Sequence, residues 1–179
     1  MSMYPIATSG VLSGGQSSVT FSSIPSTFTH LQLRCYALPP GTQGLYIQAN
    51  FNGDTGTNYA IHEFEGAASI YQAGYGSQTY MRFCGAYNSG SNLVGYPVVS
   101  IVDILDYANT NKNKTSRVLT GSDSNNSVGG VALQSNLWVS TAAVTSMTLY
   151  AYSSGSLSSF AANSKFDLYG IYSSSVTGV

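Results

Sequence analysis

Two glutamates that lie two positions apart are the first residues whose types and spacing suggest chemistry. Glu63 and Glu65 fall in a segment with strand-like alternation, 59–65, so their side chains should share one face with Cα atoms about 7 Å apart. Carboxyl groups roughly 5–9 Å apart suit hydrolysis of a glycosidic bond. Catalytic carboxylates usually come from different strands, however, and one Glu-x-Glu pattern is weak. The pattern favours two solvated charges, and we predict no enzymatic activity.

A second group of charges surrounds a turn at 109–113. Asp103 and Asp106 are three positions apart, which in a strand sends them to opposite faces, so they do not form a catalytic pair. If 98–107 and 114–120 form a hairpin, an acidic strand faces a basic one, and each ion pair contributes about 0.2–1 kcal/mol. We therefore predict that these charges set the strand register: Asp103, Asp106, Lys112, Lys114 and Arg117.

No residue pattern predicts a metal or a cofactor. His30 and His62 are the only histidines, and neither lies at a spacing typical of transition-metal ligands. The segment 52–58 (NGDTGTN) loosely resembles a calcium loop, but its single carboxylate favours an ordinary turn. Cys35 and Cys84 each lie in an apparent strand, where a small buried core residue is a commoner role than a disulfide.

The charge content excludes whole classes of partner. Six Lys or Arg and seven Asp or Glu make up 7 % of the 179 residues, against about 25 % in an ordinary soluble domain. A net charge of −1 gives no electrostatic attraction to nucleic acid. No apolar run reaches the ~18 residues that span a bilayer, and residues 1–10 do not resemble a signal peptide. We expect neither nucleic acid nor a membrane as a partner.

Alternation with a period of two residues predicts an all-β fold. We expect one antiparallel two-sheet β-sandwich, specifically a jelly roll, with the turn at 52–56 joining its flanking strands in a hairpin. Pro97–Tyr107 is apolar on both faces, which indicates either a second covering layer or a subunit interface. We expect an extended arm at 1–15, the sandwich at 16–172 and a tail at 173–179. The predicted strands are 29–37, 45–51, 59–65, 79–84, 97–107, 115–120, 128–133, 145–152 and 165–172.

Tyrosine, serine, glycine and asparagine dominate the segments between these strands. This mixture is typical of adaptable recognition surfaces, since tyrosine adds rigid contact area at a low cost in entropy. We predict recognition loops at 71–80 and 86–96, with Tyr71, Tyr75 and Tyr80 as aromatic rings that could stack on sugars. Trp138, the single tryptophan, lies between Leu137 and Val139 and is expected in the core.

Several phrases, taken in order along the chain, resemble a family of viral proteins. They are SVTFSSIP at 18–25, THLQLR at 29–34, FNGDTG at 51–56, DILDY at 103–107 with NTNK at 109–112, and FDLYGI at 166–171. The ordered set, spanning about 17–172, is similar to small virion structural proteins of tailed bacteriophages from marine and cyanobacterial hosts, of tail-fibre or decoration type. The resemblance implies a virion component and carries no catalytic motif.

We therefore expect a non-enzymatic structural protein on the particle exterior, assembled in the bacterial cytoplasm. Its role would be that of a capsid decoration (cement) subunit or a tail-fibre-type attachment subunit. The expected partners are capsid or tail proteins and further copies of the chain, with a trimer favoured by analogy with other virion appendages. The alternative is a carbohydrate-binding module that recognises a host surface polysaccharide. A glycan hydrolase that uses Glu63 and Glu65 is a third hypothesis.

Overall fold

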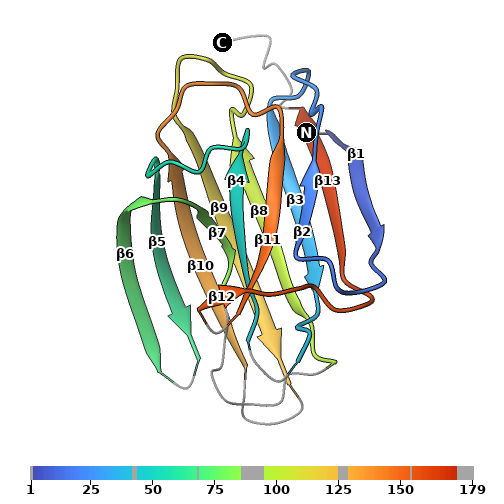
Figure 1. Cartoon of the computed structure of the whole chain (residues 1–179). Coiled ribbons are helices and arrows are strands. Elements are labelled where there is room, and N and C mark those ends of the chain that lie inside the picture. The colour runs from blue at the N-terminus through green and yellow to red at the C-terminus, as the bar shows by residue number, and fades with distance from the viewer. Residues whose placement is uncertain are drawn as a thin grey trace.

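A computed structural model describes residues 2–41, 44–67, 69–85, 95–124, 129–153 and 155–172. Within these residues the chain forms two antiparallel sheets packed face to face (Figure 1). The strands are β1 Ser2–Val11, β2 Ser18–Phe21, β3 His30–Ala37, β4 Tyr46–Phe51, β5 Tyr59–Gly66, β6 Ile70–Gln78, β7 Met81–Cys84, β8 Val98–Leu105, β9 Lys114–Asp123, β10 Gly129–Trp138, β11 Met147–Ser153, β12 Ser156–Leu157 and β13 Lys165–Tyr172.

The two sheets differ in width. The larger has eight strands in the order β1-β13-β3-β8-β9-β10-β5-β6, and the smaller has five, ordered β12-β11-β4-β7 with β2 also paired to β11. The prediction of an all-β, antiparallel two-sheet sandwich is confirmed, whereas the jelly-roll topology stays a prediction. All nine predicted strands are present, and the hairpin of β8 and β9 forms as expected.

The predicted hairpin around 52–56 is wrong. β4 belongs to the five-stranded sheet and β5 to the eight-stranded sheet, so the turn carries the chain from one layer to the other. Asn52 and Gly53 both adopt positive φ there, and the Asn52 carboxamide binds the backbone of Ala143, Thr145 and Ser146. These bonds join the turn to the segment before β11. The strands on the two sides of the turn both show alternation, but they lie in different sheets and do not pair with each other.

The predicted loop at 71–80 is also wrong in its first part, because Ile70–Gln78 is the edge strand β6. Its two glycines are of a residue type depleted in strands, so an assignment based on β-branched and apolar residues missed this strand. The other predicted loop, 86–96, lies outside the described residues from 86 to 94.

Residues 2–11 of the expected N-terminal arm are extended, but they pair with the chain's own β13 at the edge of the larger sheet. Ser9 helps to hold β1 in place, since its hydroxyl accepts a hydrogen bond from the Phe166 backbone N–H. The expected tail, 173–179, lies outside the described residues.

The core fills the space between the sheets. Inward-facing Leu31, Leu33 and Phe166 of the larger sheet meet Ile47 and Phe51 of the smaller one. Trp138 is buried there as predicted, and its ring lies edge-on to Phe51 at 5.6 Å between centroids. Both cysteines are buried and free.

Candidate functional site

A buried ion pair lies between the sheets beneath the β5–β6 edge. Glu63 on β5 is only 5 % exposed, and Nη1 of Arg82 on β7 lies 2.6 Å from both of its carboxylate oxygens. Gln134 Nε2 on β10 lies 3.4 Å from the same carboxylate. The interpretation of Glu63 as a solvated charge is therefore wrong.

Tyrosine rings surround the guanidinium of Arg82. Its Cζ lies 5.1 Å from the ring centroid of Tyr46 and 5.6 Å from that of Tyr75, within the range of cation–π attraction. The hydroxyls of Tyr75 and Tyr71 are hydrogen-bonded at 2.5 Å, and this bond is the main reason that the pKa of Tyr75 rises to about 12. The predicted site residues Tyr71 and Tyr75 thus come together on the inner side of β6. Tyr80 follows β6 and lies near the Arg82 guanidinium.

Glu65 completes this group, which we call the tyrosine–arginine cluster: Tyr46, Glu63, Glu65, Tyr71, Tyr75 and Arg82. These residues line a depression of about 300 Å³. Burial raises the pKa of Glu65, and the nearby Glu63 carboxylate adds to the effect. Since Arg82 is held by Glu63, Glu65 is the carboxylate with unused capacity to accept a hydrogen bond from a hydroxyl-rich ligand.

Asn136 explains why polar side chains point inward here. β7 is the last strand of the smaller sheet, so one side of its backbone has no neighbouring strand. The Asn136 carboxamide, on β10 of the other sheet, accepts a hydrogen bond from the Arg82 N–H and donates one to the Arg82 carbonyl. It also donates to Ser116 Oγ. A buried backbone edge is thereby satisfied by a side chain from the opposite layer.

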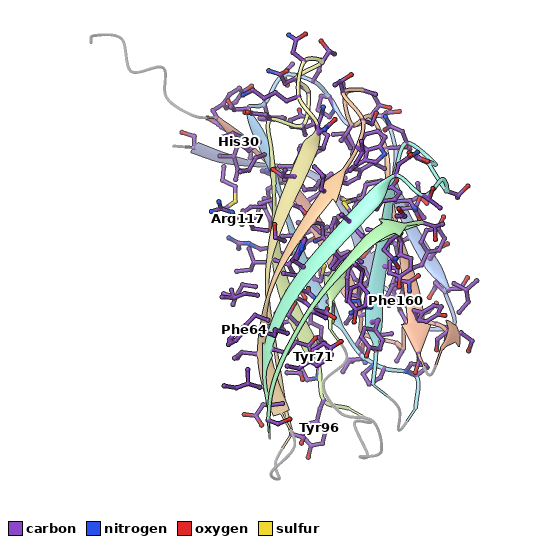
Figure 2. The ribbon with its side chains drawn as sticks, turned by 90° about the vertical axis from the view of Figure 1, so that its left-hand side faces the viewer. His30, Phe64, Tyr71, Tyr96, Arg117 and Phe160 are labelled. Carbon is purple, nitrogen blue, oxygen red and sulfur yellow. The ribbon has the colours of Figure 1, made fainter. Side chains whose placement is uncertain are left out.

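The outer face of the larger sheet is the second unusual feature. In Figure 2, Phe64 and Arg117 project from this face, while Tyr71 and Phe160 lie on the side of the second sheet. Two cross-strand rows run over β8, β9, β10 and β5. The Leu119 row contains Ile101, Leu119, Leu133 and Phe64, and the Gly121 row contains Val99, Gly121, Val131 and Gly66.

Exposed apolar side chains cover both rows and extend onto β3 and β6. We call them the outer apolar patch: Tyr36, Phe64, Ile70, Val99, Ile101, Leu119, Val131 and Leu133. Leu119 and Leu133 are 53 % and 59 % exposed. Single exposed apolar residues are normal, but a contiguous patch of this extent is typical of an interaction site. Of the two alternatives for the doubly apolar segment Pro97–Tyr107, the described residues supply no second layer over Val99 and Ile101.

The patch contains a hollow beside its most exposed ridge. An added Cβ at Gly121 would meet nothing within 4 Å, and Val99, Ile101, Leu119 and Val131 rise around it. The resulting depression has a volume of about 430 Å³. The outer apolar patch therefore presents both a protruding leucine, Leu119, and a hollow at Gly121 that could receive a leucine side chain.

The charges predicted to set register have different surroundings. Asp103 lies opposite Arg117 in the β8–β9 register but accepts a hydrogen bond from Gln32 Nε2 at 2.9 Å. Asp106 binds Lys112 at 2.8 Å, and this hydrogen bond is the largest influence lowering the pKa of Asp106. The setting of register by these charges stays a prediction.

Lys114 departs from the expected cross-strand pairing. Its side chain points inward and is buried, and Nζ donates to the carbonyls of Asn109, Lys112 and Thr141. Burial lowers the pKa of this ammonium group. Lys114 therefore ties the β8–β9 turn to the segment after β10 instead of facing an aspartate across the hairpin.

The turn considered for calcium uses its carboxylate internally. Asp54 accepts hydrogen bonds from Trp138 Nε1 at 2.7 Å, from Asn58 Nδ2 and from the Gly56 N–H. The Trp138 bond is the largest influence lowering the pKa of Asp54. Among the described residues, no group of three or more His, Cys, Asp and Glu side chains is arranged to hold a metal. His30 accepts from the Asp106 N–H, and the His62 ring lies over Gly74.

Comparison with known proteins adds no relative: no family model, curated protein or solved structure matches the chain. None of the described residues belongs to a helix long and apolar enough to cross a bilayer. The site must therefore be interpreted from its own geometry.

Sequence reasoning missed several residues of both features. Arg82 and Tyr46 join Glu63 and Glu65 only because the two sheets stack, and no local spacing connects them. Leu119 and Leu133 were assigned to strands, but their exposure was not anticipated. No local signal could have revealed it: their neighbours in the alternation, Thr120 and Gln134, are polar and would ordinarily be assigned to the exposed face, yet both are buried.

Proposed function

We propose that this protein is a non-enzymatic structural subunit on the exterior of a bacteriophage particle, acting as a capsid decoration subunit or a tail-fibre-type attachment subunit. The outer apolar patch is the observation that carries the proposal. A surface with so few charges and so large an exposed apolar area suits a subunit held against neighbours. The resemblance of the ordered phrases to phage virion proteins favours the same assignment.

The surroundings of the carboxylates support a non-enzymatic role. Both Glu63 oxygens face Arg82, and the described residues place no nucleophile or second free carboxylate beside Glu65. Glu63 therefore acts as the anchor of a buried cation. The protein would be made in the bacterial cytoplasm and join the particle there.

The test is incorporation into particles. Phage carrying an epitope-tagged copy of the protein would be purified on a density gradient, washed, and located by antibody labelling in the electron microscope. We expect the wild-type protein on the exterior and expect Leu119→Glu to be lost from the particles. Leu157→Glu is the matched control, because Leu157 is 66 % exposed but lies on β12 of the smaller sheet. Absence of the wild-type protein from washed particles would contradict the proposal.

Host glycan recognition is a second candidate, favoured by the tyrosine–arginine cluster. Tyr71 is exposed beside Glu65, and a pyranose could stack on the ring while its hydroxyls donate to the carboxylate. Tyr71→Ala should weaken saturable binding to the purified surface polysaccharide of the host bacterium at least tenfold. Tyr4→Ala, at an exposed tyrosine on β1, should leave that binding unchanged. Equal affinities for the two variants would remove this candidate.

A further inference from the structure

The outer side chains of β9 form a sequence that is complementary to its own reverse. They are Arg117, Leu119, Gly121 and Asp123: a cation, a large apolar group, an open position and an anion. If a second copy of β9 is laid antiparallel over the first, centred on the midpoint between Leu119 and Gly121, each Leu119 lies over a Gly121. Each Arg117 then lies over an Asp123.

We propose that the outer apolar patch binds the same patch of a second copy of this chain, sheet against sheet, in a symmetric dimer. This inference rests on the proposed role of that face in assembly and names its partner. The two-fold axis runs across the strands between the Leu119 row and the Gly121 row. β9 of one copy then lies antiparallel over β9 of the other.

The same axis pairs complementary groups on the neighbouring strands. The Leu119 row of one copy faces the Gly121 row of the other, so Phe64 meets the space above Gly66 and Arg34 meets Tyr36. On β13, Lys165 faces Asp167. Moving the axis onto the Leu119 row would instead bring leucine against leucine and leave Arg117 over Gly121. The position of the axis therefore follows from shape and charge together.

Area supports a stable contact. The eight side chains of the patch expose on the order of 800 Å², which is what each partner of a standard protein–protein interface buries. Sheets packed face to face lie about 10 Å apart, close enough for Leu119 to fill the hollow at Gly121.

The charges at the two ends of the pattern are free to pair between copies. Within the described part of the chain, neither Arg117 nor Asp123 forms an ion pair. Five residues of β9 lie between them, which places their Cα atoms about 20 Å apart, so they cannot reach each other within one copy. An interaction between these two positions can therefore arise only between chains.

The experiment measures the solution mass by light scattering after gel filtration and by analytical ultracentrifugation up to about 100 µM. We expect the wild-type protein to have twice the 18.8 kDa mass of one chain. Gly121→Leu should abolish the dimer, because the new side chain fills the hollow. Compared at protein concentrations where both proteins are monomeric, its thermal unfolding should stay close to that of the wild type, since Gly121 has open space and no positive φ.

Exchanging the charges of Arg117 and Asp123 tests the position of the two-fold axis. Arg117→Asp alone and Asp123→Arg alone should each raise the dimer dissociation constant at least tenfold, because each places like charges together. The double variant should restore most of the affinity, and Leu157→Glu should leave it unchanged. A wild-type monomer, a mass of three chains, or a dimer indifferent to Gly121→Leu and to charge exchange would overturn the proposal.

The outcomes also separate this pairing from the proposed function. A monomer whose Leu119→Glu variant is still lost from particles overturns the pairing and leaves the virion role standing. A dimer that never joins particles supports the pairing and contradicts the virion role.

Discussion

The two halves of the eight-stranded sheet distribute polar and apolar side chains in opposite ways. In β3 and β13 the buried face is apolar, with Leu33 and Phe166, and the outer face is polar, with Arg34 and Asp167. In β5, β9 and β10 several buried positions are polar, among them Glu63, Thr120 and Gln134, and large apolar side chains face outward, among them Phe64, Leu119 and Leu133.

The difference follows from what covers each half. β3 and β13 contribute to the main core against the smaller sheet, where only apolar packing is needed. The other half meets β7, whose free backbone edge and Arg82 require hydrogen-bonding partners from Asn136 and Glu63. Polar residues inside leave the apolar residues of the same strands outside, where a second protein surface can bury them. Alternation shows that a strand has two faces, while its surroundings decide which one is internal.

The largest expected effect tests the polar interior. Arg82→Met should lower the free energy of unfolding by about 3–5 kcal/mol, because the Glu63 carboxylate would stay buried without its partner. Urea unfolding measures this change. Glu63→Leu in the same chain should recover much of the loss, since an apolar pair replaces the ion pair. Arg34→Met, on the outer face of the other half, is the control and should cost less than about 1 kcal/mol. Equal losses of unfolding free energy for Arg82→Met and Arg34→Met would refute the contrast between the two halves of the sheet.

The next test removes one leucine from each half. Leu33→Ala should cost about 2–5 kcal/mol because that side chain is fully buried, whereas Leu133→Ala should cost less than about 0.5 kcal/mol in the monomer. Both are measured by urea unfolding in the Gly121→Leu background, which we expect to be monomeric. In the wild-type background Leu133→Ala should weaken dimerisation instead. A large loss of unfolding free energy for Leu133→Ala in the monomer would contradict the outward placement of apolar side chains in its half of the sheet.

The smallest effect is a pH dependence at the point where the chain crosses between sheets. The Trp138 hydrogen bond lowers the pKa of Asp54 in the folded state below its unfolded value, about 3.9. Its stabilising contribution is therefore complete above that value and is lost as the pH falls through the folded pKa.

We expect the stability difference between wild type and Asp54→Asn to shrink as the pH is lowered from 6 to 3, as followed by urea unfolding. Other carboxylates with lowered pKa, such as Asp106 and Asp167, titrate in both proteins and cancel in the difference. A difference that is constant across this range would show that the ionised form of Asp54 has no special role.

The site could be predicted only in part, for reasons visible at particular residues. Tyr71 and Tyr75 were identified from composition, but their place on an inward-facing edge strand depends on pairing with β5. Glu63 and Glu65 were placed on one face by strand periodicity. Their different surroundings come from Arg82, which lies in the other sheet, and contact between sheets leaves no mark in local spacing.

The sequence by itself determined that this protein is an antiparallel β-sandwich, because low charge, scarce helix-favouring residues and period-two alternation act locally and agree with each other. It also determined the β8–β9 hairpin, whose strands are joined by a short polar turn. Only the tertiary structure decided that the turn at 52–56 crosses between layers and that Leu119 and Leu133 face outward. Those outcomes depend on which strand edges and polar groups the opposite sheet must satisfy, and that requirement exists only once the two sheets are packed together.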